Sequence, residues 1–282
     1  MSAIDAHCHV WSTGDGEAFR MRDKIPALAR DFTLEELSAL QRRCNVEGTV
    51  LIQAVDSAAE SERLLAMAAR DARVLGVVAW ADPTHDDFEA TLERYRANPR
   101  FVGIRPMPHD TFGGEWLREA HTRRAFAHLE RIGCPVDLLV QEADLDALCE
   151  LLGPFGRLPS VLNHAGRPCV MAGERGPWRS RMRRLAQCPG LLVKCSGLTE
   201  RAGVEWTRET IEPWIVDLLD IFGDHRVMFA SNWPIVTLAC RYDLWFETVS
   251  SVLADVGLPA AGRDRVMRQN AVTHYGLQGV VQ

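Results

Sequence analysis

The feature that most restricts the fold of this chain is an alternation between short apolar, β-branched runs and amphipathic runs with helical spacing. The apolar runs number eight and lie at Ala3–Val10, Val46–Val55, Val74–Trp80, Phe101–Met107, Pro135–Val140, Ser160–Gly166, Leu191–Gly197 and Val227–Trp233. Most are continuous hydrophobic stretches, as is typical of parallel strands buried on both faces. Eight strand–helix units in succession predict an α/β fold, a single (β/α)8 TIM-type barrel.

The segments between these runs carry helix signals. Thr33–Glu36 and Ser57–Glu60 each have the spacing of a capping box, in which a hydroxyl and a carboxylate satisfy free backbone amides at a helix start. Further helices are predicted near Thr84–Ala97, Trp116–Ile132, Ala143–Leu152, Trp178–Gln187, Thr207–Phe222, Tyr242–Val256 and Gly262–Asn270.

The chain is expected to form one domain over residues 1–282. Its 282 residues contain no low-complexity tract or long linker that would divide them. A doubly wound open sheet is the alternative fold. No G-x-G-x-x-G motif opens a helix after a strand, which disfavours a dinucleotide-binding protein.

Charge and cysteine usage exclude several classes of protein. The formal net charge is −6, so nucleic acid and anionic membranes are poor electrostatic partners. No apolar run approaches the ~20 residues of a membrane span, and the first residues lack the basic and apolar regions of a secretory signal. The eight cysteines are scattered without a C-x-x-C pair, as expected of reduced thiols in a cytoplasmic protein.

Because barrel enzymes work at the carboxyl ends of their strands, polar residues there are the candidate site residues. The first run contains Asp5, His7 and His9, which strand alternation would place on one face. Two imidazoles so spaced can converge on a metal ion or a polarised carbonyl. His164, at the end of the sixth run, could add a third imidazole.

Two cationic residues lie near the ends of other runs. Arg105, at the end of a buried run, needs an anion or acceptor, which either a substrate or a loop carboxylate would supply. Lys194 has the same strand parity as Ser196, so both or neither point inward. An inward Lys194 would contact Asp5 or the substrate, and the alternative is a solvated lysine at an edge.

The eighth run ends in Ser231-Asn232-Trp233-Pro234. The indole face of Trp233 would suit a small ring such as a sugar, and core packing is the alternative. The same holds for Trp11 and Trp80. The remaining candidates after strands are the acids Asp56, Asp82, Asp110 and Glu142, while His109 and His274 stay unassigned.

These residues together resemble a known family. Asp5-Ala-His-Cys-His9 is similar to the D-x-H-x-H opening of the amidohydrolase superfamily. Motifs similar to its sugar-lactonase branch, the "amidohydrolase 2" family of L-fuconolactonase-like and 2-pyrone-4,6-dicarboxylate lactonase-like proteins, are Gly103-Ile-Arg-Pro106, Asn163-His-Ala-Gly-Arg-Pro168, Lys194-Cys-Ser-Gly-Leu198 and Phe222–Pro234. The resemblance extends from Asp5 to Leu277.

The resemblance implies hydrolysis of a lactone ring. Positions matching His7, His9 and His164 surround the lactone carbonyl or hold a divalent metal in such proteins, and the position of Arg105 contacts substrate. An eighth-strand carboxylate takes a proton from water in relatives, but this chain has Asn232, which can orient water and hardly deprotonate it. The fourth run also lacks the lysine of binuclear members, so two metals are not expected.

The resulting hypothesis is a hydrolase of aldonolactones in carbohydrate catabolism. His7 and His9 would hold one Zn-like ion, or would act without a metal on the carbonyl oxygen. His164 and Asn232 would be the catalytic residues, while Arg105, Lys194 and Trp233 would bind the lactone. Alternatives are a decarboxylase or amidase for a small acid, and a catalytically impaired sugar-acid-binding protein. The expected partner is a small-molecule lactone, and the outer helices of a barrel would allow a homodimer.

Overall fold

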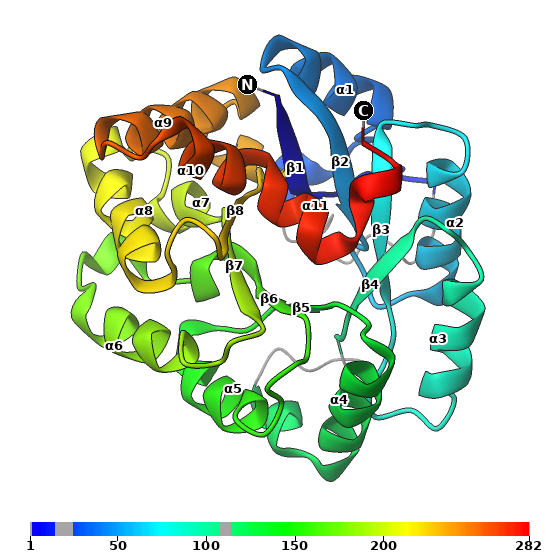
Figure 1. The fold of residues 1–282 in the computed structure, drawn as a ribbon. Helices are drawn as coiled ribbons and strands as arrows, with labels where there is room; N and C mark the ends of the chain where they lie inside the picture. Colours follow the sequence, from blue (N-terminus) through cyan, green and yellow to red (C-terminus); the bar gives the residue numbers. More distant parts are fainter. Residues whose placement is uncertain (1, 15–24, 108–113, 282) are drawn as a thin grey trace.

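The computed structural model describes residues 2–14, 25–107 and 114–281. Eight parallel strands form one sheet in chain order, and helices surround it (Figure 1). The strands are β1 (Ala3–Cys8), β2 (Val46–Ile52), β3 (Val74–Trp80), β4 (Phe101–Arg105), β5 (Val136–Leu138), β6 (Ser160–Leu162), β7 (Leu191–Cys195) and β8 (Val227–Phe229). A parallel bridge between Cys8 and Trp233 brings the chain beyond β8 against β1. The predicted (β/α)8 barrel is confirmed, and each apolar run contains a strand.

The helices match the amphipathic runs with one addition. They are α1 (Leu34–Arg43), α2 (Ala58–Ala68), α3 (Phe88–Arg96), α4 (Ala120–Ile132), α5 (Leu145–Leu152), α6 (Gly176–Leu185), α7 (Leu198–Ala202), α8 (Arg208–Phe222), α9 (Tyr242–Asp255), α10 (Ala260–Asp264) and α11 (Asn270–Tyr275). Helix α7, which follows β7, was not predicted, because five residues are too few to show a helical period. The predicted helix at Gly262–Asn270 is in fact parts of α10 and α11 joined by a π-helical turn.

At both predicted capping boxes, only the hydrogen bond to the hydroxyl group forms. Thr33 and Ser57 accept hydrogen bonds from the amides of Glu36 and Glu60. The reciprocal hydrogen bond, in which the Glu side chain accepts from the backbone amide of Thr33 or Ser57, does not form, because each carboxylate has stronger partners. Glu36 makes a two-point ion pair with Arg30, and Glu60 accepts from two amides of the β2–α2 loop. Charge-assisted bonds of this kind are the stronger ones.

Apolar side chains fill the barrel and the space between the sheet and the helices. The cluster inside the barrel contains Ile4, Ala6, Val50, Ile52, Leu75, Val78, Val161, Met228, Ala230, Ala271, Val272, Tyr275 and Leu277. Its last four members come from α11 and the residues after it. Asn270 donates to the carbonyl of Val227 at the start of β8, and Arg268 pairs with Glu47 at the start of β2. Helix α11 therefore closes the amino end of the barrel, which leaves the carboxyl end for a site.

All eight cysteines are free thiols, as predicted. Among the described residues, no helix has both the length and the apolarity that crossing a bilayer requires.

Candidate active site at the carboxyl end of the barrel

Three imidazoles meet at the carboxyl end of the barrel. The Nε2 atoms of His7 and His9 are 3.1 Å apart. The ring centroids of His7 and His164 are 4.5 Å apart, with the rings edge to face. All three side chains are buried. His7, His9 and His164 thus form one cluster, although more than 150 positions separate the first two from the third. We call it the imidazole cluster.

A bulge in β1 separates Asp5 from this cluster. Asp5 pairs with Thr49 and Cys8 pairs with Leu51, so three steps along β1 match two along β2. One extra residue reverses the alternation of side chains. The predicted common face of Asp5 and the two histidines is therefore wrong. The Asp5 carboxylate instead accepts hydrogen bonds from the Tyr242 hydroxyl at 3.0 Å and from the backbone amide of Ser231 at 2.8 Å.

His164 is held by a left-handed turn directly after β6. Its φ is 53°, and the same conformation recurs at Ala165 and Arg167. Nδ1 of His164 lies 2.9 Å from the Ser196 hydroxyl, beyond the end of β7. A Cβ at Gly197 would lie 2.6 Å from the Cβ of His164, and Gly197 has a φ of 70°. Only glycine fits there, because both the space and the backbone conformation exclude a side chain.

Lys194 lies inside the barrel beneath the imidazole cluster. The side chain is 0% exposed. Its Nζ is 2.5 Å from Oδ2 of Asp137 and 3.3 Å from Nδ1 of His7. The Tyr275 hydroxyl donates to the other oxygen of Asp137 at 2.8 Å. The acidic partner is thus Asp137 rather than the expected Asp5, and the solvated-edge alternative is wrong. A substrate contact of Lys194 stays a prediction.

The charge of Lys194 determines the tautomers of the first two imidazoles. An ammonium group only donates, so Nδ1 of His7 must accept and its Nε2 carries the proton. That N–H points at Nε2 of His9, which must then accept. The remaining nitrogen of His9, Nδ1, donates to the carbonyl of Ile52 at 2.8 Å. Each donor in this series of hydrogen bonds, from Lys194 through His7 and His9 to Ile52, has an acceptor, so the assigned tautomers agree with one another.

Burial and nearby cations keep the imidazole cluster neutral. Burial is the main cause that lowers the pKa of each histidine, and the pKa of His9 falls to about 3. The next causes are Lys194 for His7, Arg105 for His9 and Arg167 for His164. A neutral cluster beside cationic side chains favours an oxygen atom that acquires negative charge.

Arg105 and two amide side chains present unpaired polar atoms near this cluster. The Arg105 guanidinium donates to the backbone carbonyl of Gln53, and no described carboxylate forms an ion pair with it. Its Nε is buried without a partner in the described structure, as are Oε1 of Gln53 and both amide atoms of Asn163. Burial lowers the pKa of Arg105 to about 10, so it remains charged. Such atoms need a ligand or water to offset their lost hydration.

Asn232 pairs with a carboxylate that the sequence motifs did not indicate. Its Nδ2 donates to Oε1 of Glu200 at 2.7 Å. The Thr199 hydroxyl donates to the other Glu200 oxygen, also at 2.7 Å. Burial raises the pKa of Glu200. Glu200 lies in α7, and only its position shortly after an apolar run could have indicated it, as for the other acids at strand ends.

The tryptophans near strand ends take packing positions. Trp233 is 0% exposed and contacts the ring of Phe32, with centroids 5.5 Å apart. Trp11 also packs on Phe32. The indole N–H of Trp80 donates to the carbonyl of Met107 at 2.7 Å. The core-packing alternative therefore describes Trp233 in this structure, and its contact with a lactone remains a prediction.

The other acidic candidates have local partners. Asp82 accepts from the amide and hydroxyl of Thr84. Glu142 accepts from the amide of Cys169. His274 lies at the opposite end of the barrel beside Tyr275. Asp56 follows β2 in a loop. Two further candidates, His109 and Asp110, lie outside the described residues.

The side chains at the mouth do not fit a divalent metal. Catalytic zinc sites commonly take three protein ligands. In the part of the chain that the structure describes, no group of three or more His, Cys, Asp or Glu side chains could hold a metal ion. The contact with Lys194 also places the proton of His7 on Nε2, the nitrogen that faces His9. Metal binding at this nitrogen would require that proton to move, because a protonated nitrogen has no lone pair to give.

This arrangement predicts that activity does not depend on an added metal. After dialysis against a chelator, the rate of the lactone hydrolysis that the resemblance implies should stay within about twofold of the untreated rate, because the positive charge at the mouth comes from side chains. Metal content by mass spectrometry and the initial rate with and without zinc measure this. A rate that vanishes on chelation and returns with stoichiometric zinc would contradict it.

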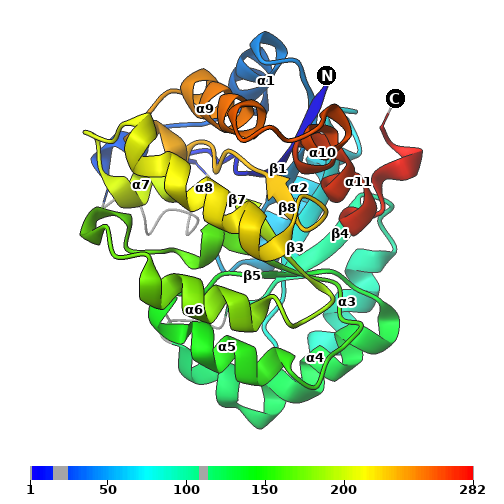
Figure 2. The same cartoon turned by 60° about the vertical axis from the view of Figure 1, so that its left-hand side comes forward.

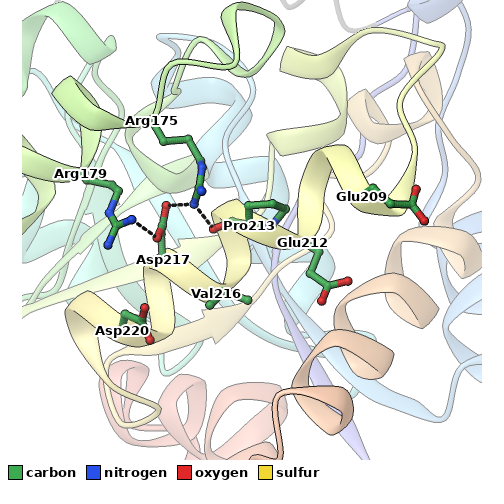
Figure 3. A pocket seen from close by; sticks show the side chains of 8 residues that line it. All are labelled: Arg175, Arg179, Glu209, Glu212, Pro213, Val216, Asp217 and Asp220. Carbon is green, nitrogen blue, oxygen red and sulfur yellow. Dashed lines mark hydrogen bonds and ion pairs between the residues drawn. The ribbon is translucent and has the colours of Figure 1, made fainter.

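A separate groove on the outer layer carries no such chemistry. It has a volume of about 550 Å³ and lies between α6 and α8, which run side by side on the outside of the barrel (Figure 2). Figure 3 shows Asp217 held between Arg175 and Arg179. These charges satisfy one another and hold α6 to α8, so the groove is explained by packing of the two helices.

The fold and the cluster define a (β/α)8-barrel protein with an imidazole site at the carboxyl ends of its strands. The amidohydrolase family model matches residues 4–277, and the chain belongs to that family. It is 30% identical to an L-fucono-1,5-lactonase of Burkholderia ambifaria over 96% of this chain and 94% of that protein. The crystal structure of an amidohydrolase from Burkholderia multivorans with bound zinc superposes with a TM-score of 0.90 at 27% identity, covering 98% of this chain and 99% of that one.

Proposed function

We propose that this protein hydrolyses the lactone ring of a sugar acid, an L-fucono-lactone or a related aldonolactone. The observation that carries the proposal is the meeting of three neutral imidazoles beside Arg105 and Lys194 at the barrel mouth. The similarity to L-fucono-1,5-lactonases of two Burkholderia species, at 30% and 29% identity, supports the same substrate class.

The roles of the side chains follow from where negative charge develops on the lactone during hydrolysis. Water attacks the ester carbonyl carbon, and the carbonyl oxygen becomes an oxyanion. The N–H of a neutral imidazole and the guanidinium of Arg105 stabilise that oxyanion in a site with little water, where such contacts are strongest. Lys194 acts through His7, whose tautomer it sets. His164 is a weak base because its pKa is lowered, so we assign it a hydrogen bond to the carbonyl oxygen.

The unpaired polar atoms support a substrate rich in hydroxyl groups. A hydroxyl both donates and accepts, so it can satisfy Oε1 of Gln53, Nε of Arg105 and the amide of Asn163. An unsubstituted lactone would leave these atoms without partners. Sites built to bind a hydroxyl reject the analogue that lacks it.

A panel of lactones tests the proposal. The purified chain is assayed by proton release on L-fucono-1,5-lactone, other aldono-1,4- and 1,5-lactones, and δ-valerolactone. We expect hydrolysis of at least one aldonolactone well above the spontaneous rate. The matched control is His7→Phe, which keeps a ring at the position and removes its hydrogen bonds. If the unmodified chain opens no lactone, the assignment is wrong and a sugar-acid-binding protein becomes the interpretation.

Gln53 gives a sharper prediction about specificity. Gln53→Ala should reduce kcat/KM for the preferred aldonolactone by about tenfold, the effect of one lost hydrogen bond to a substrate hydroxyl. The rate on δ-valerolactone, which has no ring hydroxyl, should change much less. The ratio of the two kcat/KM values is the measurement. An equal loss on both substrates would mean that Gln53 only supports Arg105.

A further inference from the structure

The proposed hydrolysis needs a group that accepts a proton from the attacking water. As the oxygen of water bonds to carbon, one of its O–H bonds must break. The imidazoles are poor acceptors, because burial and the cations Lys194, Arg105 and Arg167 disfavour their charged forms. An anionic oxygen at the mouth would serve better.

Most carboxylates near the barrel in the described structure are committed elsewhere. Asp5 faces the helix layer and accepts from Tyr242. Asp137 lies below the cluster, with Lys194 on one oxygen and a hydroxyl on the other. Glu60 accepts from two amides of the β2–α2 loop. None of the three offers a free oxygen toward the mouth.

Glu200 is different in position and in partners. It lies on α7 shortly after β7, and a Cβ at Gly197, the residue before that helix, would lie 2.6 Å from the Cβ of His164. The residue is only partly buried, whereas Asp5, Asp137 and Glu60 are buried. Its two hydrogen bonds come from neutral donors, the amide of Asn232 and the hydroxyl of Thr199. Among the described residues, no Lys or Arg side chain forms an ion pair with it.

Asn232 connects this carboxylate to the imidazole cluster. The backbone amide of Asn232 donates to the carbonyl of His7 at 2.9 Å, and its φ of 62° turns the chain sharply there. Because Nδ2 is directed at Glu200, Oδ1 points away from the carboxylate. It makes no hydrogen bond with the described residues, so it can accept one from a water molecule.

We infer that Glu200 is the catalytic carboxylate that accepts the proton of the attacking water, with Asn232 fixing its position. The new C–O bond forms as the water proton moves to Glu200 and the carbonyl π electrons move to oxygen. When the carbonyl re-forms, the ring C–O bond breaks and protonated Glu200 returns the proton to the departing alkoxide. The sum is lactone plus water to hydroxy acid, and the carboxylate is regenerated.

This inference rests on the proposed lactone hydrolysis, and Glu200→Gln tests it. Glutamine has the same shape and can accept from Asn232 through its oxygen and donate to the Thr199 hydroxyl through its NH2 group, so the variant should fold. We expect kcat on the best lactone to fall at least about 100-fold, the usual size of a general-base effect, with KM within threefold. The control is Glu205→Gln, the same change at an exposed position five residues later, which should leave kcat unchanged.

A second test of the inference moves the carboxylate from position 200 to position 232. In a Glu200→Gln background, Asn232→Asp restores an acid at the other end of the same 2.7 Å contact, and kcat should recover at least tenfold. The inference is overturned if Glu200→Gln keeps more than a third of the native kcat, or if the double variant is no faster than Glu200→Gln. If the unmodified chain hydrolyses no lactone, the proposed function fails and this inference fails with it.

Discussion

Replacing Lys194 by methionine should destabilise the protein by about 3–5 kcal/mol, because removing one partner of a buried ion pair leaves the other charge uncompensated. Methionine has a similar shape and no donor, so Asp137 would keep only the hydroxyl of Tyr275. Both members of the pair are 0% exposed, and water cannot replace the ammonium. Urea unfolding monitored by circular dichroism measures the loss.

A double variant separates loss of the ion pair from loss of packing. Lys194→Met with Asp137→Asn removes both charges, and the asparagine can still accept from Tyr275. Most of the lost stability should return, as for buried pairs replaced by neutral groups. The control is Arg241→Met, which breaks an exposed ion pair with Asp243 and should leave the unfolding midpoint unchanged. Equal stabilities for the single and double variants would contradict this account.

The sequence predicted the barrel because the fold depends on a pattern that repeats eight times. A buried parallel strand needs a continuous apolar run, and such runs are visible without knowing their neighbours. The meeting of His7, His9 and His164 followed from the rule that strand ends share one edge. Local patterns also located Thr33 and Ser57 as helix caps.

The partners of buried polar groups could not be predicted in the same way. Alternation placed Asp5 with the histidines, but a single extra residue in β1 reversed its face. That bulge depends on the pairing of β1 with β2, which the β1 residues alone do not record. Asp137 is one polar residue in an apolar run, and its ion pair with Lys194 spans 57 positions. Glu200 lies in a helix too short to recognise.

Acid should unfold this protein at a higher pH than its carboxylates alone would require. The pKa values of His7, His9 and His164 are lowered by burial, whereas unfolded histidines titrate near pH 6.5. A group with a lowered native pKa binds fewer protons when folded, so the stability it contributes is present above pH 6.5 and is lost as the pH falls. Burial also lowers the pKa of His274, to about 4, so four such groups should remove about 5 kcal/mol between pH 7 and pH 5.5.

The raised pKa values of Asp5, Glu60 and Glu200 act in the opposite direction, because their native forms take up protons at a higher pH than their unfolded forms, which do so near pH 4. The difference in slope between a histidine variant and the unmodified chain therefore reports the imidazole contribution. Urea unfolding at several pH values measures the slope. His164→Asn, which suits the left-handed backbone there, should reduce the loss by about a quarter, since one of four groups is removed. His85→Ala, at a side chain 68% exposed, should leave the slope unchanged. If His164→Asn and the unmodified chain lose stability equally, the imidazole cluster is not the cause.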